Sequence, residues 1–96
     1  MALKRELRLS GPEAARLFHL LSDPTRLRVL LLIGEKGEAS PSDLATAAGM
    51  SRQATLYHLA LLRRGGVVGA RRAGHQVFYR VTSPPLLRLL GEVGEG

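Results

Sequence analysis

The segment from residue 40 to residue 66 constrains the fold more than any other part of the chain. It reads SPSDLATAAGMSRQATLYHLALLRRGG and predicts two short helices separated by a tight turn. Ser40 is suited to cap the first helix, and Pro41 to its first position, where no backbone N–H bond is required. Gly49 suits the left-handed conformation that ends a helix, and Ser51 suits the cap of the second. Two capped helices joined by a glycine turn therefore form the centre of the predicted fold.

The second of these helices has one face suited to burial and one suited to solvent. Hydrophobic periodicity assigns four residues to the buried face, namely Ala54, Thr55, Leu59 and Leu62. The solvent-facing residues are mostly polar or basic: Arg52, Gln53, Leu56, Tyr57, Ala60, Arg63 and Arg64. A helix, a glycine turn and a second helix with Arg, Gln and Tyr near its start are typical of a DNA-reading helix-turn-helix. An ordinary helical hairpin packed into a core has the same pattern, so this segment alone leaves both interpretations open.

The placement of charge favours the DNA-binding interpretation. The formal net charge is +6, and residues 51–80 contain six arginines with no Asp or Glu, while the rest of the chain balances eight basic against eight acidic residues. Basic residues concentrated in one third of a small domain are typical of proteins that bind polyanions. Codon bias or a hot habitat would also enrich arginine, but neither explains thirty consecutive residues without an acid.

Composition limits the other functions open to this chain. Its 96 residues predict one domain over residues 1–96 with a single core. The absence of cysteine excludes a disulfide framework, a thiolate metal site and a cysteine nucleophile, and it suits a cytoplasmic protein. The apolar run over residues 29–33 is too short to span a bilayer, so no membrane partner is expected. His19, His58 and His75 have no paired carboxylate or nucleophile in a recognisable pattern, so neither an enzyme nor a cofactor is expected.

A helix is predicted over residues 10–21, before the central segment. Ser10 and Glu13 fit a capping box, and Pro12 lies in the first turn. Apolar residues at the spacing i, i+3, i+4 and i+7 give this helix a stripe that consists of Ala14, Leu17, Phe18 and Leu21.

The next helix is predicted to begin at an Asp23 cap followed by Pro24 and to end at Gly34. From Leu27 onward it is apolar almost all round. A helix of this kind is buried on several sides, so it is expected to be the central helix. Residues 35–39 are expected to form a turn.

A β-hairpin is predicted over residues 67–81, directly after the second helix of the central pair. Two β-prone runs flank a tip at residues 73–76, where Gly74 can supply a positive φ. Arg71 and Arg72 precede this tip and Arg80 follows it. A basic hairpin in this position is typical of the wing of a winged helix.

The chain is predicted to end in a helix over about residues 84–93. Its leucine stripe has little chain left to cover it, so an interface with a second copy is expected, with packing onto its own domain as the alternative. All five prolines of the sequence fall at predicted helix starts, in agreement with the hydrophobic periodicity.

Three motifs in this order resemble the ArsR/SmtB transcriptional repressors. LSDPTRLRVLLLI resembles the opening L-x-D-P-T-R-L-x-I-L signature of that family. Residues 43–68 resemble its helix-turn-helix, with D-L-A, a Gly-led turn, Ser51, His58-Leu59, Leu62 and a G-[LV]-V ending. ARRAGHQVFYRV resembles its R-x-G-x-x-V-Y-Y-R-L wing. The resemblance covers about residues 20–82.

The resemblance implies a mainly α winged helix-turn-helix with five helices and a two-stranded wing. Members of the family are homodimers that pair through their first and last helices, bind double-stranded operator DNA and leave it when an effector binds. By position, and with the basic residues Arg63 and Arg71 added, the residues expected at DNA are Ser51, Arg52, Gln53, Leu56, Tyr57, Arg63, Arg71, Arg72 and His75. The residues expected at the dimer interface are Leu17, Phe18, Leu21, Leu86, Leu89 and Leu90. His58 matches a common family histidine with an expected structural or phosphate-proximal role.

The sequence departs from the family pattern in three places. The thiolate metal sensors carry C-x-C-D-L where this chain has Ser40-Pro41-Ser42-Asp43-Leu44, and without sulfur a soft-metal site cannot form there. The D-x-H and H-x-x-E pattern of the zinc and nickel sensors is absent from LLRLLGEV. A small hydroxyl residue is usual where Leu56 stands, and a leucine facing DNA can touch a thymine methyl but cannot hydrogen-bond a base.

The sequence therefore predicts a DNA-binding transcriptional regulator, a homodimeric repressor without a metal at either common family site. Its effector is not identified. The alternative is a winged-helix protein-interaction module that does not read DNA sequence, which Leu56 and the apolar last helix favour and the acid-free basic segment opposes.

Overall fold

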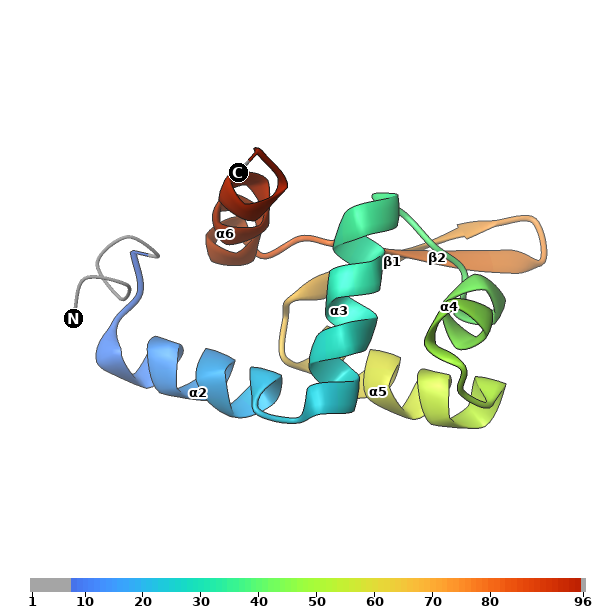
Figure 1. Cartoon of the computed structure of the whole chain (residues 1–96), viewed down its shortest axis with the longest axis horizontal. Helices are drawn as coiled ribbons and strands as arrows, with labels where there is room; N and C mark the ends of the chain where they lie inside the picture. Colours follow the sequence, from blue (N-terminus) through green and yellow to red (C-terminus); the bar gives the residue numbers. More distant parts are fainter. Residues whose placement is uncertain (1–7, 96) are drawn as a thin grey trace.

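Five helices and one antiparallel hairpin make up residues 8–95, the part of the chain that the computed structural model describes. Side chains are described for residues 8–91, and residues 1–7 and 96 of the predicted domain lie outside the described residues. The elements follow the predicted order (Figure 1): α2 Gly11–Leu21, α3 Pro24–Lys36, α4 Pro41–Ala48, α5 Arg52–Arg64, β1 Val68–Ala73, β2 Gln76–Val81 and α6 Pro84–Glu95. The predicted fold class, a winged helix-turn-helix, is confirmed.

Side-chain caps begin the first four helices where the sequence predicts them. In α2, the N–H of Glu13 donates to the Ser10 hydroxyl, and the Ser10 N–H donates to the Glu13 carboxylate, which completes the capping box. The bonds with Ser10 lower the pKa of Glu13 below its ordinary value. The caps of α3, α4 and α5 are Asp23, Ser40 and Ser51. Each cap satisfies a backbone N–H that the helix itself leaves free, which fixes where the helix starts.

Helix α3 stands upright between α2 and α5 below and α6 and the hairpin above (Figure 1). Val29, Leu30 and Ile33 are buried in the core, as a central helix requires. Leu31 is 45% exposed, however, so the apolar surface of α3 is not covered all round. The prediction of a central helix is confirmed, and its outer side remains open to solvent.

The predicted end of this helix at Gly34 is wrong, because α3 continues to Lys36 and stops at Gly37. Gly37 has φ +80°, which an L side chain rarely adopts, and this conformation turns the chain out of the helix. Gly34 serves packing instead. A Cβ atom at that position would lie 2.9 Å from Cδ1 of Leu90 in α6. The missing side chain therefore allows α6 to approach α3 closely.

The hairpin pairs β1 with β2 from Val68 opposite Val81 to Ala73 opposite Gln76, which leaves Gly74 and His75 as a two-residue loop. Gly74 has φ +64°, as predicted. The predicted turn over residues 35–39 ends in a β-bridge, in which Ala39 and Tyr79 exchange two backbone hydrogen bonds of 3.0 and 2.8 Å. This bridge attaches the base of the hairpin to the chain between α3 and α4.

Candidate nucleic-acid interface

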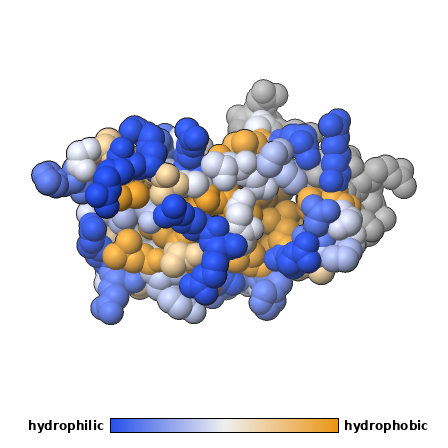
Figure 2. All heavy atoms as spheres, turned by 180° about the vertical axis from the view of Figure 1, so that it is seen from behind, coloured by the Kyte–Doolittle hydropathy of each residue, from blue (hydrophilic) through white to orange (hydrophobic). Residues whose placement is uncertain are grey.

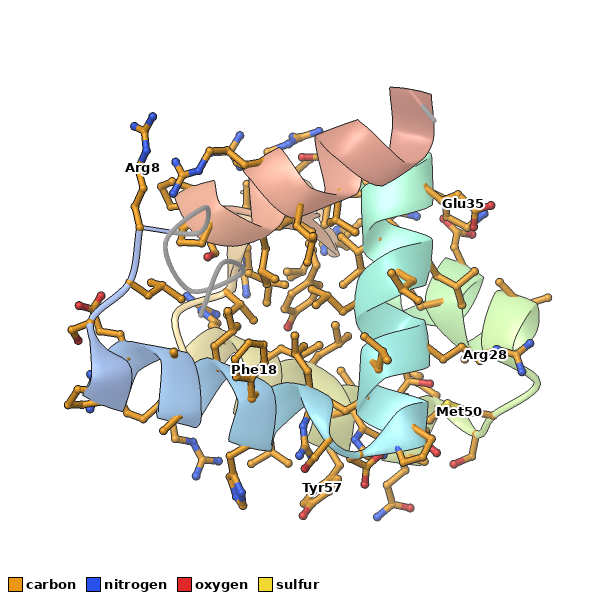
Figure 3. The ribbon with its side chains drawn as sticks, turned by 60° about the vertical axis from the view of Figure 1, so that its left-hand side comes forward. Arg8, Phe18, Arg28, Glu35, Met50 and Tyr57 are labelled. Carbon is orange, nitrogen blue, oxygen red and sulfur yellow. The ribbon has the colours of Figure 1, made fainter. Side chains whose placement is uncertain are left out.

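Helix α5 presents the side chains that the sequence assigned to solvent. Thr55, Leu59 and Leu62 are fully buried, while Leu56 is 39% and Tyr57 62% exposed. The helix therefore has the predicted phase, and Leu56 faces outward although it is apolar. Tyr57 projects away from the body of the domain (Figure 3).

The turn before α5 fixes the direction of this face. Gly49 adopts the predicted left-handed conformation, with φ 66° and ψ 37°. The Ser51 hydroxyl accepts from the N–H of Ala54 at 3.0 Å, and the Thr55 hydroxyl donates to the Ser51 carbonyl at 2.9 Å. The hydroxyl of the buried Thr55 thus has its partner within α5, and two side-chain hydrogen bonds with Ser51 stabilise the first turn of the helix.

Arg52 at the start of α5 is held by α4. Its Nη1 donates to the Ser42 hydroxyl at 2.7 Å, across the turn that separates the two helices. Both side chains are exposed, so the guanidinium keeps further donors for a ligand. Arg52 is thus positioned beside Gln53, which is also exposed.

Two hollows lie between α5 and the hairpin. The larger, of about 480 Å³, is lined by Leu56, Ala60, Arg63, Arg64 and Tyr79. The other, of about 410 Å³, extends to the start of α4 and the tip of the hairpin, with Leu56 and Tyr79 again in its lining. Two residues predicted at DNA, Arg52 and His75, and the acid Asp43 also line it. Together the hollows form a groove along one side of α5.

Arg71 in β1 already has an acidic partner within the chain. Its Nε and Nη2 donate to the two carboxylate oxygens of Glu38 at 2.8 and 2.6 Å, and its guanidinium lies 5.1 Å from the ring centre of Phe78. The bonds from Arg71 lower the pKa of Glu38 and raise that of Arg71. Residues 51–80 contain no acid, but this ion pair places one carboxylate, from the loop after α3, beside them. Both side chains remain partly exposed, so the pair lies at the surface.

The other basic side chains of this face lie at the surface of α5 and the hairpin. Arg63 and Arg64 are exposed at the end of α5, and Arg72, His75 and Arg80 are exposed on the hairpin. Arg63 and Arg72 line a third, smaller hollow of about 210 Å³ between the two elements. The predicted DNA residues on α5 and on the hairpin thus lie on adjoining surfaces.

His58 lies on the inner side of α5, away from this face. It is half buried and forms an edge-to-face ring contact with Tyr57 at 5.2 Å between centroids. Asp23, the cap of α3, is close enough that His58 contributes to lowering its pKa, although the N–H of Arg26 contributes most. Arg26 also donates from Nε to the Leu20 carbonyl at 2.6 Å, which ties the end of α2 to the start of α3.

Sequence reasoning missed three residues that shape this surface, namely Glu38, Ser42 and Tyr79. Glu38 pairs with a residue 33 positions away, and no local pattern marks such a pair. Ser42 was considered only for the sulfur it lacks, although its hydroxyl holds Arg52. Tyr79 was predicted only as part of the hairpin over residues 67–81, whereas the fold places it in the groove.

The residues predicted at a dimer interface separate into two groups. Leu17 and Leu86 are buried in the core of this chain, with Leu86 only 1% exposed, so they are not available to a partner. Leu21, Leu89 and Leu90 are half buried, and Phe18 is 37% exposed on α2 (Figure 3). Leu87, one position after the buried leucine, is 49% exposed. An apolar surface on α2 and α6 remains open, which includes Phe18 and Leu87 but not the buried Leu17 and Leu86.

The two serines at the family's thiolate positions are both engaged in hydrogen bonds. The Ser40 hydroxyl accepts from the N–H of Asp43 at 3.2 Å, and the Ser42 hydroxyl accepts from Arg52. Across the part of the chain that the structure describes, no group of three or more His, Cys, Asp or Glu side chains is arranged to hold a metal ion. None of the described helices has the length and apolarity that crossing a bilayer requires.

Known proteins with related sequences are transcriptional regulators. A helix-turn-helix domain family model matches residues 21–68. The arsenical resistance operon repressor of Escherichia coli is 43% identical over 67 residues, which are 70% of this chain and 57% of that protein. The regulator CmtR of Mycobacterium tuberculosis is 40% identical over 79 residues, which are 82% of this chain and 66% of that protein. This chain thus spans less than two thirds of either relative.

A solved structure carries the same fold. It is a winged helix-turn-helix DNA-binding domain from Mycobacterium bovis, described as homodimeric and as a possible ArsR-family regulator. The TM-score is 0.75 at 33% identity, and the match covers 88% of this chain and 77% of that one. The chain belongs to the ArsR/SmtB family of winged helix-turn-helix transcriptional regulators.

Proposed function

We propose that this chain is a cytoplasmic, sequence-specific DNA-binding repressor that acts as a homodimer. The observation that carries the proposal is the outer face of α5, which is exposed, free of acids and bordered by an arginine-bearing hairpin. Seven side chains point outward from this helix, and three of them are arginines. A duplex major groove admits one α-helix, and the phosphates beside it attract arginine.

In this proposal α5 enters the major groove and its first turn reads base edges. Gln53 is suited to adenine, which offers an acceptor and a donor side by side, and Arg52 to guanine or to a phosphate. Tyr57, at the outer edge of the helix, is suited to a phosphate oxygen. The basic residues Arg63, Arg71, Arg72 and His75 supply sequence-independent affinity through the backbone.

The homodimer joins two copies through the apolar surface of α2 and α6. The exposed side chains of Phe18 and Leu87 support this part of the proposal, because a monomer that leaves them in water loses the gain from burying them. Two copies of α5 would then reach successive major grooves, so half-sites are expected about one helical turn apart on a near-palindrome.

The proposed repressor does not sense metal at the two sites common in its family. The hydrogen bonds of Ser40 and Ser42 support this, because hydroxyl oxygens bound to N–H donors replace the thiolates that a soft metal requires. Zinc or a chelator is expected to leave DNA affinity unchanged, and a tenfold shift with zinc would contradict this part.

The deciding experiment is fluorescence anisotropy of the purified chain on duplex DNA from upstream of its own gene, with a scrambled duplex at the same salt. Tight binding to the first duplex alone is expected. Equal, weak and salt-sensitive binding to both would instead favour a protein-interaction module, the alternative that the exposed Leu56 and Leu87 make reasonable.

A further inference from the structure

The groove between α5 and the hairpin has an apolar middle and basic borders. Leu56 and Tyr79 line both of its hollows and so mark the place where the two meet. Arg52 lines the hollow on one side of them, and Arg63 and Arg64 line the hollow on the other. Seen from behind, hydrophobic surface lies between hydrophilic side chains on this face of the molecule (Figure 2).

The borders of this groove indicate what occupies it. Arginines at both ends are complementary to consecutive phosphates of one nucleic-acid strand, and Asp43 is the one acid in the lining of the two hollows. The walls are the outer face of α5, the hairpin and the start of α4. A duplex with α5 in its major groove would lay the strand nearest the hairpin along this groove. The bases of that strand would then present their major-groove edges towards Leu56.

We propose that Leu56 determines specificity by packing against the C5-methyl group of a thymine in this strand. This inference rests on the proposed DNA-binding function. The methyl group is the one apolar feature of the major-groove edge, and leucine has no donor or acceptor for the others. It projects from the pyrimidine towards its own strand's backbone, the side on which the groove places Leu56. A cytosine at this position has only a hydrogen at C5, so the leucine would lose this contact and lie beside the polar N4 amino group, which costs affinity.

The size of the effect follows from the burial of a single methyl group. Removing it is expected to weaken binding about fourfold per half-site, the factor that corresponds to one buried CH₂. The effect is small compared with that of a bidentate hydrogen bond, and it is confined to one position. A direct test must therefore change the methyl group alone.

Uracil substitution makes that change without altering base pairing. The probe is a duplex selected by the purified chain from a randomised pool, in which each thymine is replaced in turn by deoxyuridine. Anisotropy at fixed salt is expected to show one position in each half-site where uracil weakens binding about fourfold. Leu56→Ala should remove this uracil penalty, while Leu31→Ala, which truncates a similarly exposed leucine on α3, should retain it.

Each outcome decides between the inference and the function on which it rests. If the chain binds its selected duplex tightly and no uracil matters, Leu56 does not read a methyl group, and the DNA-binding function stands. A uracil penalty that persists in Leu56→Ala would assign the contact to another residue and overturn the inference. If no duplex is preferred over random DNA, the proposed function itself fails. Thermal melting of both variants confirms that they are folded before the comparison is made.

Discussion

The face formed by α5 and the hairpin differs from the face formed by α2 and α6 in the polarity of its exposed side chains. On α5, the exposed side chains are mostly polar or basic, and the larger apolar ones point inward except for Leu56. On α2 and α6, Phe18 and Leu87 stay in water although the core of a single chain is already formed. The first face is mainly polar and basic with one exposed leucine, whereas the second exposes apolar side chains from two helices.

The difference shows how each face is held in place. Side chains on the α5 face are fixed by bonds within the chain, such as Arg52 with Ser42 and Arg71 with Glu38. The open side of α2 and α6 has apolar groups that only burial can stabilise. The first face is thus suited to a charged ligand that arrives later, and the second to a permanent partner.

The largest expected effect comes from breaking the apolar face. Phe18→Glu places a charge at an exposed position, so the monomer should fold while a dimer through α2 should not form. Operator affinity is then expected to fall by about 100-fold or more, because the two half-sites are no longer held by one linked molecule. Analytical ultracentrifugation and anisotropy measure the two changes. His19→Glu, on the same helix at another exposed position, should leave both unchanged.

A smaller loss is expected from the base-reading side of α5. Gln53→Ala should lower the preference for operator over random duplex by about 1–3 kcal/mol if the glutamine bonds adenine with both amide atoms. Affinity for random duplex should hardly change, because glutamine carries no charge. Competition binding with the two duplexes measures this ratio. Unchanged binding to both duplexes would remove Gln53 from the readout.

Two neighbouring arginines offer a sharper comparison within the hairpin. Arg72→Ala should weaken all sequences alike and reduce the salt slope of binding by about 1 per protomer. Arg71→Ala should reduce the slope less, because Glu38 already compensates the charge of Arg71. Anisotropy over a series of salt concentrations gives both slopes. Equal slopes for the two variants would mean that DNA displaces Glu38 from Arg71.

The smallest predicted change concerns the titration of Glu38. Its pKa is lowered from the ordinary 4.5 by the hydrogen bonds from Arg71, so Arg71→Ala should raise it back towards that value. Since the folded pKa is depressed, the contact contributes fully above the ordinary value and is lost as pH falls through the folded one. An NMR titration of the Glu38 carboxyl carbon measures the shift. Arg72→Ala is the matched control, and a pKa that does not move in Arg71→Ala would contradict the role of the pair.

Local chemistry made most of the fold predictable. Caps at Ser10, Asp23, Ser40 and Ser51, and prolines near the helix starts, specify where helices begin through bonds that span three or four residues. Periodicity then gave the phase of α5 correctly, including the outward position of Leu56. Each of these signals lies within one or two turns of the residue that it specifies.

The errors occurred where a distant element decides the outcome. Glycine commonly ends a helix, which is why the end was predicted at Gly34. The close approach of Leu90 from α6 instead makes Gly34 a packing position inside α3. Leu86 and Leu87 look alike in the sequence, and only the docking of α6 on α3 buries the first and exposes the second.

By itself, the sequence determined the order of the helices, the hairpin and the outward face of α5, because capping, helical period and turn chemistry act over a few residues. Only the tertiary structure decided that Glu38 compensates Arg71, that Ser42 holds Arg52 and that Leu56 and Tyr79 line one groove. These pairs join residues ten or more positions apart. Which of them meet depends on how the helices pack around α3, and no local pattern in the chain records that packing.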